Sequence, residues 1–423
     1  MSDTPELKRS LSLLQITLYG LGTILGAGIY VLVGKVAGDA GMYAPVSFLV
    51  AAVLAVLTGL SYAELCARYP KSAGVAFYTH QGFGRRHLSV TAGFLIILTG
   101  LVSAATLVNG FVGYLHVFVA LPDWLVITLL VLALGALAAW GIAESVFAAS
   151  AITLIEVGGL LLILFVAGDS LADLPARLPE LIPPLDGSAW HGILLGAFLA
   201  FYAFIGFEDM VNVAEEVKRP ERNLPRAILI AVGVSTLLYL LVALVAVLAM
   251  PPHELSQTRA PLAAIYERAT GSAPTLISLI SLLAVVNGAL VQIIMGSRVF
   301  YGMSREGWLH RALGRVHVRT RTPLLATALV TALVLVLALW LPLVTLAKAT
   351  SFIILIVFAI VNLALARIKL RSPTTPWMEE VELRREWQSR PQGVRVYPLW
   401  VPIAGFITTT ALLLFQTVGW LRG

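Results

Sequence analysis

Eleven long apolar runs divide this sequence, and each is long enough to cross a lipid bilayer as a helix. Such a helix needs about 20 mainly apolar residues. Hydrophobic residues make up 59% of the 423 residues and charged residues only 12%, against roughly 25% charged in soluble domains, which excludes a soluble globular enzyme. We therefore expect an all-α polytopic membrane protein with 11 transmembrane helices. The runs cover residues 12–37, 44–67, 88–119, 124–141, 147–167, 190–213, 226–250, 273–299, 324–342, 345–366 and 398–418.

The basic residues predict the orientation of the chain. Cytoplasmic loops of membrane proteins carry an excess of Lys and Arg. If the N-terminus is cytoplasmic, 23 of the 29 basic residues fall on the inner side, including those at 8–9, 68–86, 218–226 and 298–321. We expect a plasma-membrane protein with a cytoplasmic N-terminus and an extracytoplasmic C-terminus. The net charge of +6 then reflects membrane topology and not a nucleic-acid partner.

The sequence carries no sign of a catalytic or metal centre. Its single cysteine is Cys66, and the histidines do not have the spacing of metal ligands. The sequence also lacks an HExxH, a GxSxG and a P-loop motif. We expect no enzymatic activity, no metal and no cofactor, and the oligomeric state stays open.

Two of the apolar runs contain signs of a broken helix. The first carries Gly26 and Gly28, and the sixth carries Gly206 followed by Glu208. Glycine weakens a helix interior, and unwound backbone at membrane depth is tolerated only where it lines a cavity or meets a ligand. The two runs are five apart, which is the spacing expected of an inverted repeat with interrupted helices at matching positions. The alternative is that these small residues only allow close helix packing.

At these residues the sequence resembles the amino acid–polyamine–organocation superfamily, which has a LeuT-type fold of five plus five helices. The resemblance rests on the segments 22–30, 62–78, 201–225 and 298–323, of which FYAFIGFEDMVNVAEEVKRPERNLP is the most specific. It implies discontinuous helices 1 and 6 and a secondary transporter with alternating access. The family usually has twelve spans, so this chain would lack the twelfth.

The resemblance divides the chain into four parts. Residues 1–11 would be a cytoplasmic segment, and residues 12–366 a ten-helix core with repeats at about 12–167 and 190–366. Residues 367–397 would be a cytoplasmic linker, and residues 398–423 the eleventh helix with a short external tail.

The resemblance also implies an α-amino acid substrate at the two breaks. The substrate carboxylate would meet N–H groups at the start of the second half of helix 1, and its ammonium would meet carbonyls freed by unwinding. Phe201 and Phe204 would act as aromatic gates, and Ser103 is one of several polar positions expected to set selectivity, with Thr99, Thr106, Asn109, Asn287, Gln292, Thr350 and Ser351. Span 3 has no acidic residue, which favours a neutral amino acid of small to medium size over a cationic one. The expected substrate-binding residues are Thr23, Ile24, Gly26, Ala27, Gly28, Ile29, Ser103, Tyr202, Ala203, Phe204 and Ile205.

Two carboxylates within the apolar runs are candidates for proton coupling. A charge at the middle of a bilayer costs at least about 2.5–3.5 kcal/mol, so such residues are seldom accidental. Glu156 lies in mid-span at or near the position where sodium-independent relatives carry a lysine, and Glu208 follows the second break. Either would carry the coupling proton, and the alternative is that both are neutral structural residues. Run eight lacks the hydroxyl pair of sodium-coupled relatives, so we expect no sodium coupling.

A gate on the cytoplasmic side is a further expectation. The mixed-charge segment 215–222 would pair with Glu64, Arg68 and the segment of Arg298 and Arg305 to close it. Two alternatives to a proton-coupled symporter stay open within the family, namely an exchanger of amino acids or polyamines and a cationic amino acid permease. A non-transporting nutrient sensor is the alternative from another class.

Overall fold

The computed structural model describes residues 11–422 except 27, 71–73, 141–145, 306, 308, 318–319, 321 and 372–394. Within these residues the chain is helical, and an isolated bridge between Leu11 and Val217 is the only strand-like pairing that they form. The helices of the first half are α1 (Leu13–Leu25), α2 (Gly28–Ala40), η1 (Gly41–Tyr43), α3 (Ala44–Arg68), α4 (Gly74–Phe83), α5 (Arg86–Leu115), α6 (Asp123–Trp140), α7 (Val146–Val166), η2 (Gly168–Asp173) and α8 (Leu174–Leu181). Those of the second half are α9 (Gly187–Ala200), η3 (Phe201–Phe204), η4 (Phe207–Glu216), α10 (Pro220–Ala249), α11 (Pro252–Gln257), α12 (Pro261–Thr270), α13 (Thr275–Arg305), η5 (Arg311–Gly314), α14 (Leu324–Trp340), α15 (Leu343–Leu370) and α17 (Trp400–Arg422).

Local sequence signals set several helix starts. Ser12 caps α1 through a capping box, in which the Gln15 side chain accepts from the Ser12 backbone N–H at 3.0 Å. Proline stands in the first turn of α3, α10 and α12, where its missing N–H has no helical acceptor to lose. The starts of α1 and α3 lie at the starts of the first two apolar runs, whereas α10 begins six residues before its run and α12 lies between two runs.

Eight helical segments are long and apolar enough to cross a membrane, or nine if the bent pair Ser150–Val166 and Gly168–Leu181 is one span, counted over the described residues. This count is lower than the eleven expected runs. The first two runs fall within one helical stretch, Leu13–Arg68, and α14 is a shorter apolar helix of 17 residues. The chain is a polytopic helical membrane protein, and the number eleven stays a prediction.

Tryptophans mark the ends of the peripheral helices. Trp124 and Trp140 stand at the two ends of α6, and Trp400 and Trp420 stand near the two ends of α17, all with exposed side chains. Tryptophan is enriched at both interfaces of a bilayer. These two helices therefore have the length and the terminal aromatics of membrane-crossing elements.

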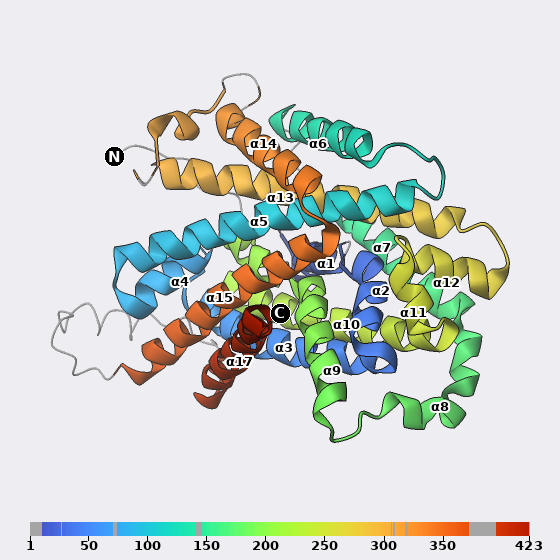
Figure 1. The fold of residues 1–423 in the computed structure, drawn as a ribbon. Coiled ribbons are helices and arrows are strands. Elements are labelled where there is room, and N and C mark those ends of the chain that lie inside the picture. Colours follow the sequence, from blue (N-terminus) through green and yellow to red (C-terminus); the bar gives the residue numbers. More distant parts are fainter. Residues whose placement is uncertain are drawn as a thin grey trace.

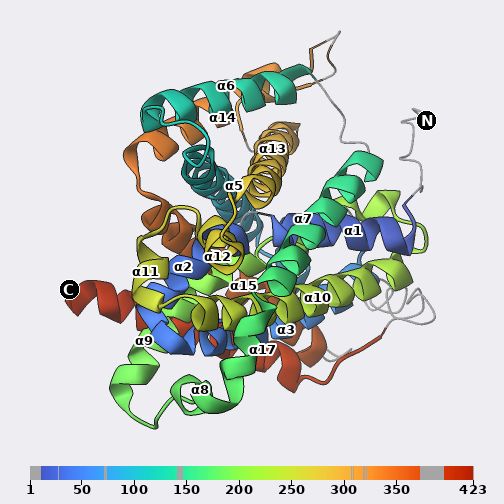
Figure 2. The ribbon, with the colours of Figure 1, turned by 90° about the vertical axis from the view of Figure 1, so that its right-hand side faces the viewer.

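The long helices pack in two groups. One group joins α3, α10 and α9 with the two halves of the first broken helix, and the other joins α5 and α13 with α6 and α14. Figures 1 and 2 show α6 and α14 side by side at one edge of the molecule, away from α3 and α17. Helix α7 contacts α1 of the first group and α13 of the second, so it lies where the two groups meet. The two helix breaks face this junction.

Candidate functional site

The first helix is interrupted at Gly26. Helix α1 ends at Leu25 and α2 begins at Gly28, and Gly26 between them has φ 15° and ψ −139°, which is not helical. Ala27, expected to bind substrate, lies outside the described residues. The first N–H groups of a helix have no acceptor within it and carry partial positive charge. The amides of Gly28 and Ile29 are therefore placed as anion donors at the break.

The second interruption lies at Ile205 and Gly206. The chain leaves η3 in an extended conformation at Ile205 and turns at Gly206, whose φ of 130° is in the region that favours glycine. Thr23 of α1 donates from its hydroxyl to the Gly206 carbonyl at 3.1 Å. The sequence thus breaks both helices with glycine, and the fold brings the breaks together.

Tyr239 of α10 ties the two breaks to one point. Its hydroxyl lies 2.8 Å from the Ile24 carbonyl and 2.8 Å from the Ala203 carbonyl. A hydroxyl has one proton, so it donates to one of these carbonyls at a time. The other carbonyl then has an acceptor position available to a ligand ammonium.

A small cavity of about 30 Å³ lies between the breaks and α13. Volume for roughly one water molecule is present, so a substrate must open the cavity further. Among the described residues, none of those lining it carries a charge. The lining residues are Tyr19, Gly22, Thr23, Ile24, Gly26, Gly28, Ser103, Leu107, Thr153, Tyr202, Ile205, Asn287, Gly288, Val291 and Gln292.

The structure separates the expected binding residues into two sets. Thr23, Ile24, Gly26, Gly28, Ser103, Tyr202 and Ile205 line the cavity. Ile29, Ala203 and Phe204 are buried close by but do not line it. Of the other polar positions, Asn287 and Gln292 line the cavity, whereas Thr99, Thr106 and Thr350 donate to carbonyls of their own helices.

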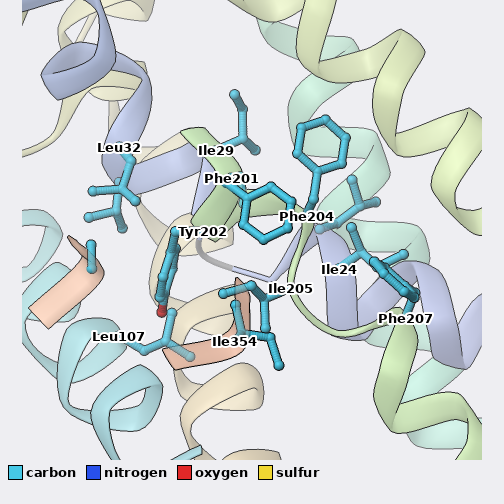
Figure 3. Close-up of a cluster of buried hydrophobic side chains, with 14 of the residues drawn as sticks. Ile24, Ile29, Leu32, Leu107, Phe201, Tyr202, Phe204, Ile205, Phe207 and Ile354 are labelled. Atoms are coloured by element: carbon cyan, nitrogen blue, oxygen red, sulfur yellow. The ribbon is translucent and has the colours of Figure 1, made fainter. Parts of the chain in front are cut away.

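The aromatic residues of the second break point in different directions. The Tyr202 hydroxyl lies 3.1 Å from the Ser103 hydroxyl, and Figure 3 shows it turned toward Leu107 of α5. Phe204 packs on the Tyr239 ring at 5.1 Å, and Phe201 packs on Phe358 at 5.8 Å. Tyr202 therefore lines the cavity, whereas the two phenylalanines expected to act as gates, Phe201 and Phe204, do not.

Glu156 of α7 is fully buried and stands just outside the cavity wall. Its Oε1 accepts from Asn287 Nδ2 at 3.4 Å, and its Oε2 has no hydrogen-bond partner among the described residues. Its backbone carbonyl accepts from the Tyr30 hydroxyl, which joins α7 to α2. A buried carboxyl with an unused oxygen is costly unless it is neutral or has a function.

Glu208 and Asp209 are buried and line a second, larger cavity of about 860 Å³. Glu208 Oε2 accepts from the Gly206 N–H at 2.9 Å, and Asp209 Oδ2 accepts from Gln292 Nε2 at 3.4 Å. Arg298 and Glu216 line the same cavity. We call this cavity the vestibule. Its lining includes His80 of α4, Arg86 at the start of α5 and Arg298 of α13.

Glu64, expected to belong to a gate, is fully buried in a cluster at the end of α3. Arg68 donates to its Oε1 from Nε at 3.0 Å, Lys369 of α15 lies 2.7 Å from its Oε2, and the Tyr397 N–H donates to Oε2 at 2.9 Å. The segment 215–222 takes no part in these bonds. Glu64 and Arg298 thus belong to different clusters in this conformation.

Sequence reasoning did not single out Tyr239, Asp209 or Thr153 for the site. Asp209 follows Glu208 directly, and its position in the same broken segment was a usable signal. Tyr239 is one tyrosine in a thirty-residue apolar helix, and no local pattern distinguishes it. Only the packing of α10 against both breaks identifies its role.

Comparisons with known proteins identify the family of the chain. The amino acid permease family model matches residues 11–420. The chain is 28% identical to the branched-chain amino acid permease BcaP of Bacillus subtilis over 89% of this chain and 84% of that protein. It is 30% identical to cationic amino acid transporter 4 of Mus musculus over 88% of this chain and 61% of that protein. It is 33% identical to an uncharacterized transporter of Mycobacterium bovis over 85% of this chain and 80% of that protein. The chain belongs to the amino acid permease family of the amino acid–polyamine–organocation superfamily.

Proposed function

We propose that this protein is a secondary active transporter that moves neutral amino acids of small to medium size by alternating access. The observation that carries the proposal is the direct apposition of two glycine-broken helices around one cavity. Gly28, at the start of α2, and Ile24, at the end of α1, line this cavity, and the Ala203 carbonyl lies beside it, where it shares the Tyr239 hydroxyl with the Ile24 carbonyl. These groups suit the carboxylate and the ammonium of an α-amino acid without a charged side chain.

The fold supports a LeuT-type arrangement of five plus five helices. The two packing groups hold elements in corresponding positions of the two halves, with α5 and α6 beside α13 and α14. An inverted repeat places its broken helices and its binding site at the interface of the halves. We place repeat 1 at about 12–167 and repeat 2 at about 190–366, followed by the linker and an eleventh span.

We also propose a plasma-membrane location with the N-terminus inside. The excess of basic residues on that side supports it. In this orientation the vestibule, lined by Arg86 and Arg298, lies on the cytoplasmic side of the protein.

The absence of a charged lining residue supports a neutral substrate, as does the printed name of the branched-chain relative. A cationic substrate is the second candidate. It is favoured by the carboxyl groups of Glu208 and Asp209 in the lining of the vestibule and by the name of the transporter from Mus musculus. A binding screen of all common amino acids by thermal shift distinguishes the two candidates.

We propose that a proton gradient drives uptake and that Glu156 carries the coupling proton. Its burial and its unpartnered Oε2 support this role. Sodium is not required in this mechanism. In proteoliposomes, wild-type uptake is expected to respond to pH and to a protonophore and to be unchanged by a sodium titration.

The Glu156→Gln variant is expected to lose the proton dependence or all uptake, with Glu208→Gln as the matched carboxyl-to-amide control. Loss of proton dependence in Glu208→Gln alone would assign the proton to Glu208 instead. Uptake by the wild type that ignores pH and protonophore would overturn proton coupling. Counter-flow that requires internal substrate would indicate an exchanger, and binding without any flux would indicate a sensor.

A further inference from the structure

Helix α13 presents two amide side chains that stand between the cavity and a buried carboxylate. Asn287 and Gln292 both line the cavity. Asn287 Nδ2 lies 3.4 Å from Glu156 Oε1, and Gln292 Nε2 lies 3.4 Å from Asp209 Oδ2. Neither carboxylate lines the cavity itself. Asp209 lines the second cavity, whereas Glu156 lines neither cavity, so Asn287 is the amide that stands between the central cavity and an enclosed carboxyl group.

The surroundings of Glu156 leave Asn287 as its one side-chain hydrogen-bond partner within the described residues. The titratable groups that face Glu156 from neighbouring helices are Tyr30 of α2 and Tyr239 of α10. Tyr114 of α5 stands behind Tyr30 and donates to its carbonyl. Phenols have an ordinary pKa of about 10, so they stay neutral where a carboxyl titrates. No described Lys, Arg or His forms an ion pair with Glu156. The Asn287 amide is therefore the side chain whose hydrogen bond changes when Glu156 gains or loses its proton.

An amide offers different groups on its two sides. An ionised carboxylate only accepts hydrogen bonds, so it holds the NH₂ group of Asn287 and turns the amide oxygen toward the cavity. A protonated carboxyl group donates its O–H, so the amide oxygen can turn to it and the NH₂ group can face the cavity. The NH₂ group is a donor for a substrate carboxylate, whereas the amide oxygen is not.

We propose that Asn287 is a positioning residue that couples substrate binding to the protonation of Glu156 by reversal of its side-chain amide. The inference rests on the proposed proton coupling at Glu156. Protonated Glu156 turns a donor toward the cavity and strengthens substrate binding, and ionised Glu156 weakens it. Because protonation of Glu156 strengthens substrate binding, the proton and the substrate bind together, as symport requires.

The test is the pH dependence of KM for the purified full-length transporter in proteoliposomes. In the wild type, KM is expected to rise by about tenfold as the pH is raised from below to above the range in which Glu156 titrates, because one hydrogen bond to a charged substrate group is lost. The Asn287→Leu variant, of similar size, is expected to have a KM that is raised but independent of pH, while its maximal rate stays measurable. A merely structural role would lower the rate or the yield and leave the pH profile unchanged.

Two controls separate the possible outcomes. Gln292→Leu removes the other amide of α13 and Ser103→Ala removes a cavity hydroxyl, and both are expected to keep the wild-type pH profile. The proposal would be overturned if KM of the Asn287→Leu variant depended on pH as it does in the wild type. It would also be overturned if KM became independent of pH in the Gln292→Leu variant alone. A flat profile already in the wild type would instead refute proton coupling itself.

A spectroscopic measurement covers the case in which Asn287→Leu does not fold. The Asn287→Ser variant keeps a polar group but shortens the side chain beyond reach of both sites. In the wild type, addition of substrate is expected to shift the carboxyl band of Glu156 in the infrared difference spectrum. In the Asn287→Ser variant, we expect substrate to leave the position of this band unchanged. An unchanged shift in that variant would count against the relay.

Discussion

Gly28 and Ala203 bring the backbones of the two broken helices into direct contact. A Cβ atom built on Gly28 would lie 2.6 Å from the Ala203 Cα, closer than real Cβ atoms approach. The side-chain-free position at the start of α2 is what lets η3 lie against it. This contact aligns the freed donors of one break with the freed acceptors of the other.

Substitution of Gly28 by alanine is expected to reduce substrate uptake by at least about fivefold, since overpacking costs about 1–3 kcal/mol where backbone must move. Uptake of labelled substrate by proteoliposomes measures the effect. Gly233→Ala in α10 is the matched control, because a Cβ atom there meets nothing within 4 Å. Equal uptake by the two variants would show that the contact is dispensable.

The Tyr239→Phe variant is expected to weaken substrate affinity by about fivefold, since it removes one hydrogen bond worth about 1 kcal/mol to the break carbonyls. The KM of uptake or a binding titration reports this change. Tyr78→Phe serves as the control, because the buried Tyr78 hydroxyl has no hydrogen-bond partner among the residues that the structure describes. Its removal should leave affinity unchanged, and a comparable loss in both variants would argue against a special role for Tyr239.

Ser103 and Tyr202 are expected to act as a coupled pair. Their hydroxyls lie 3.1 Å apart and join α5 to the second break. In a double-mutant cycle of Ser103→Ala and Tyr202→Phe, the coupling energy for substrate binding should be about 0.5–1.5 kcal/mol. Additive effects on Kd would mean that this bond does not shape the cavity.

The cluster around Glu64 is expected to stabilise the fold. Lys369→Met leaves one oxygen of a fully buried carboxylate without its cation, which should lower the unfolding free energy by about 1–3 kcal/mol. Thermal unfolding in detergent measures the loss. Arg268→Met breaks the exposed pair with Glu254 and should cost about 0–1 kcal/mol. Recovery of stability in a Glu64→Gln and Lys369→Met double variant would support the charge argument.

Much of the architecture follows from local patterns. The length and apolarity of the runs predict helices that cross a membrane, and glycines at 26, 28 and 206 predict both breaks. The family resemblance was carried by the same short segments and is confirmed by the comparison over residues 11–420. These features depend on residues that are close together along the chain, so they can be predicted from the sequence.

Other features depend on contacts between distant segments. Sequence reasoning assigned Phe204 to the pocket, but its ring packs on Tyr239, thirty-five residues further along, outside the cavity lining. It expected Glu64 near a charged cytoplasmic loop, whereas Lys369 and Tyr397 hold it. The sequence of one helix does not indicate which other helix packs against it. These pairings therefore follow from the way the helices cross in the folded protein.

The sequence alone is enough to identify a helical membrane protein with the motifs of the amino acid permease family and to locate two helix breaks. The lengths of the apolar runs and the positions of the glycines are local properties of the chain, so both can be recognised without a structure. The roles of Tyr239, which joins the breaks, and of Asn287, which stands between Glu156 and the cavity, become visible only in the folded chain. A hydrogen bond needs two groups within about 3.5 Å, and the packing of α7, α10 and α13 alone brings these groups within that reach.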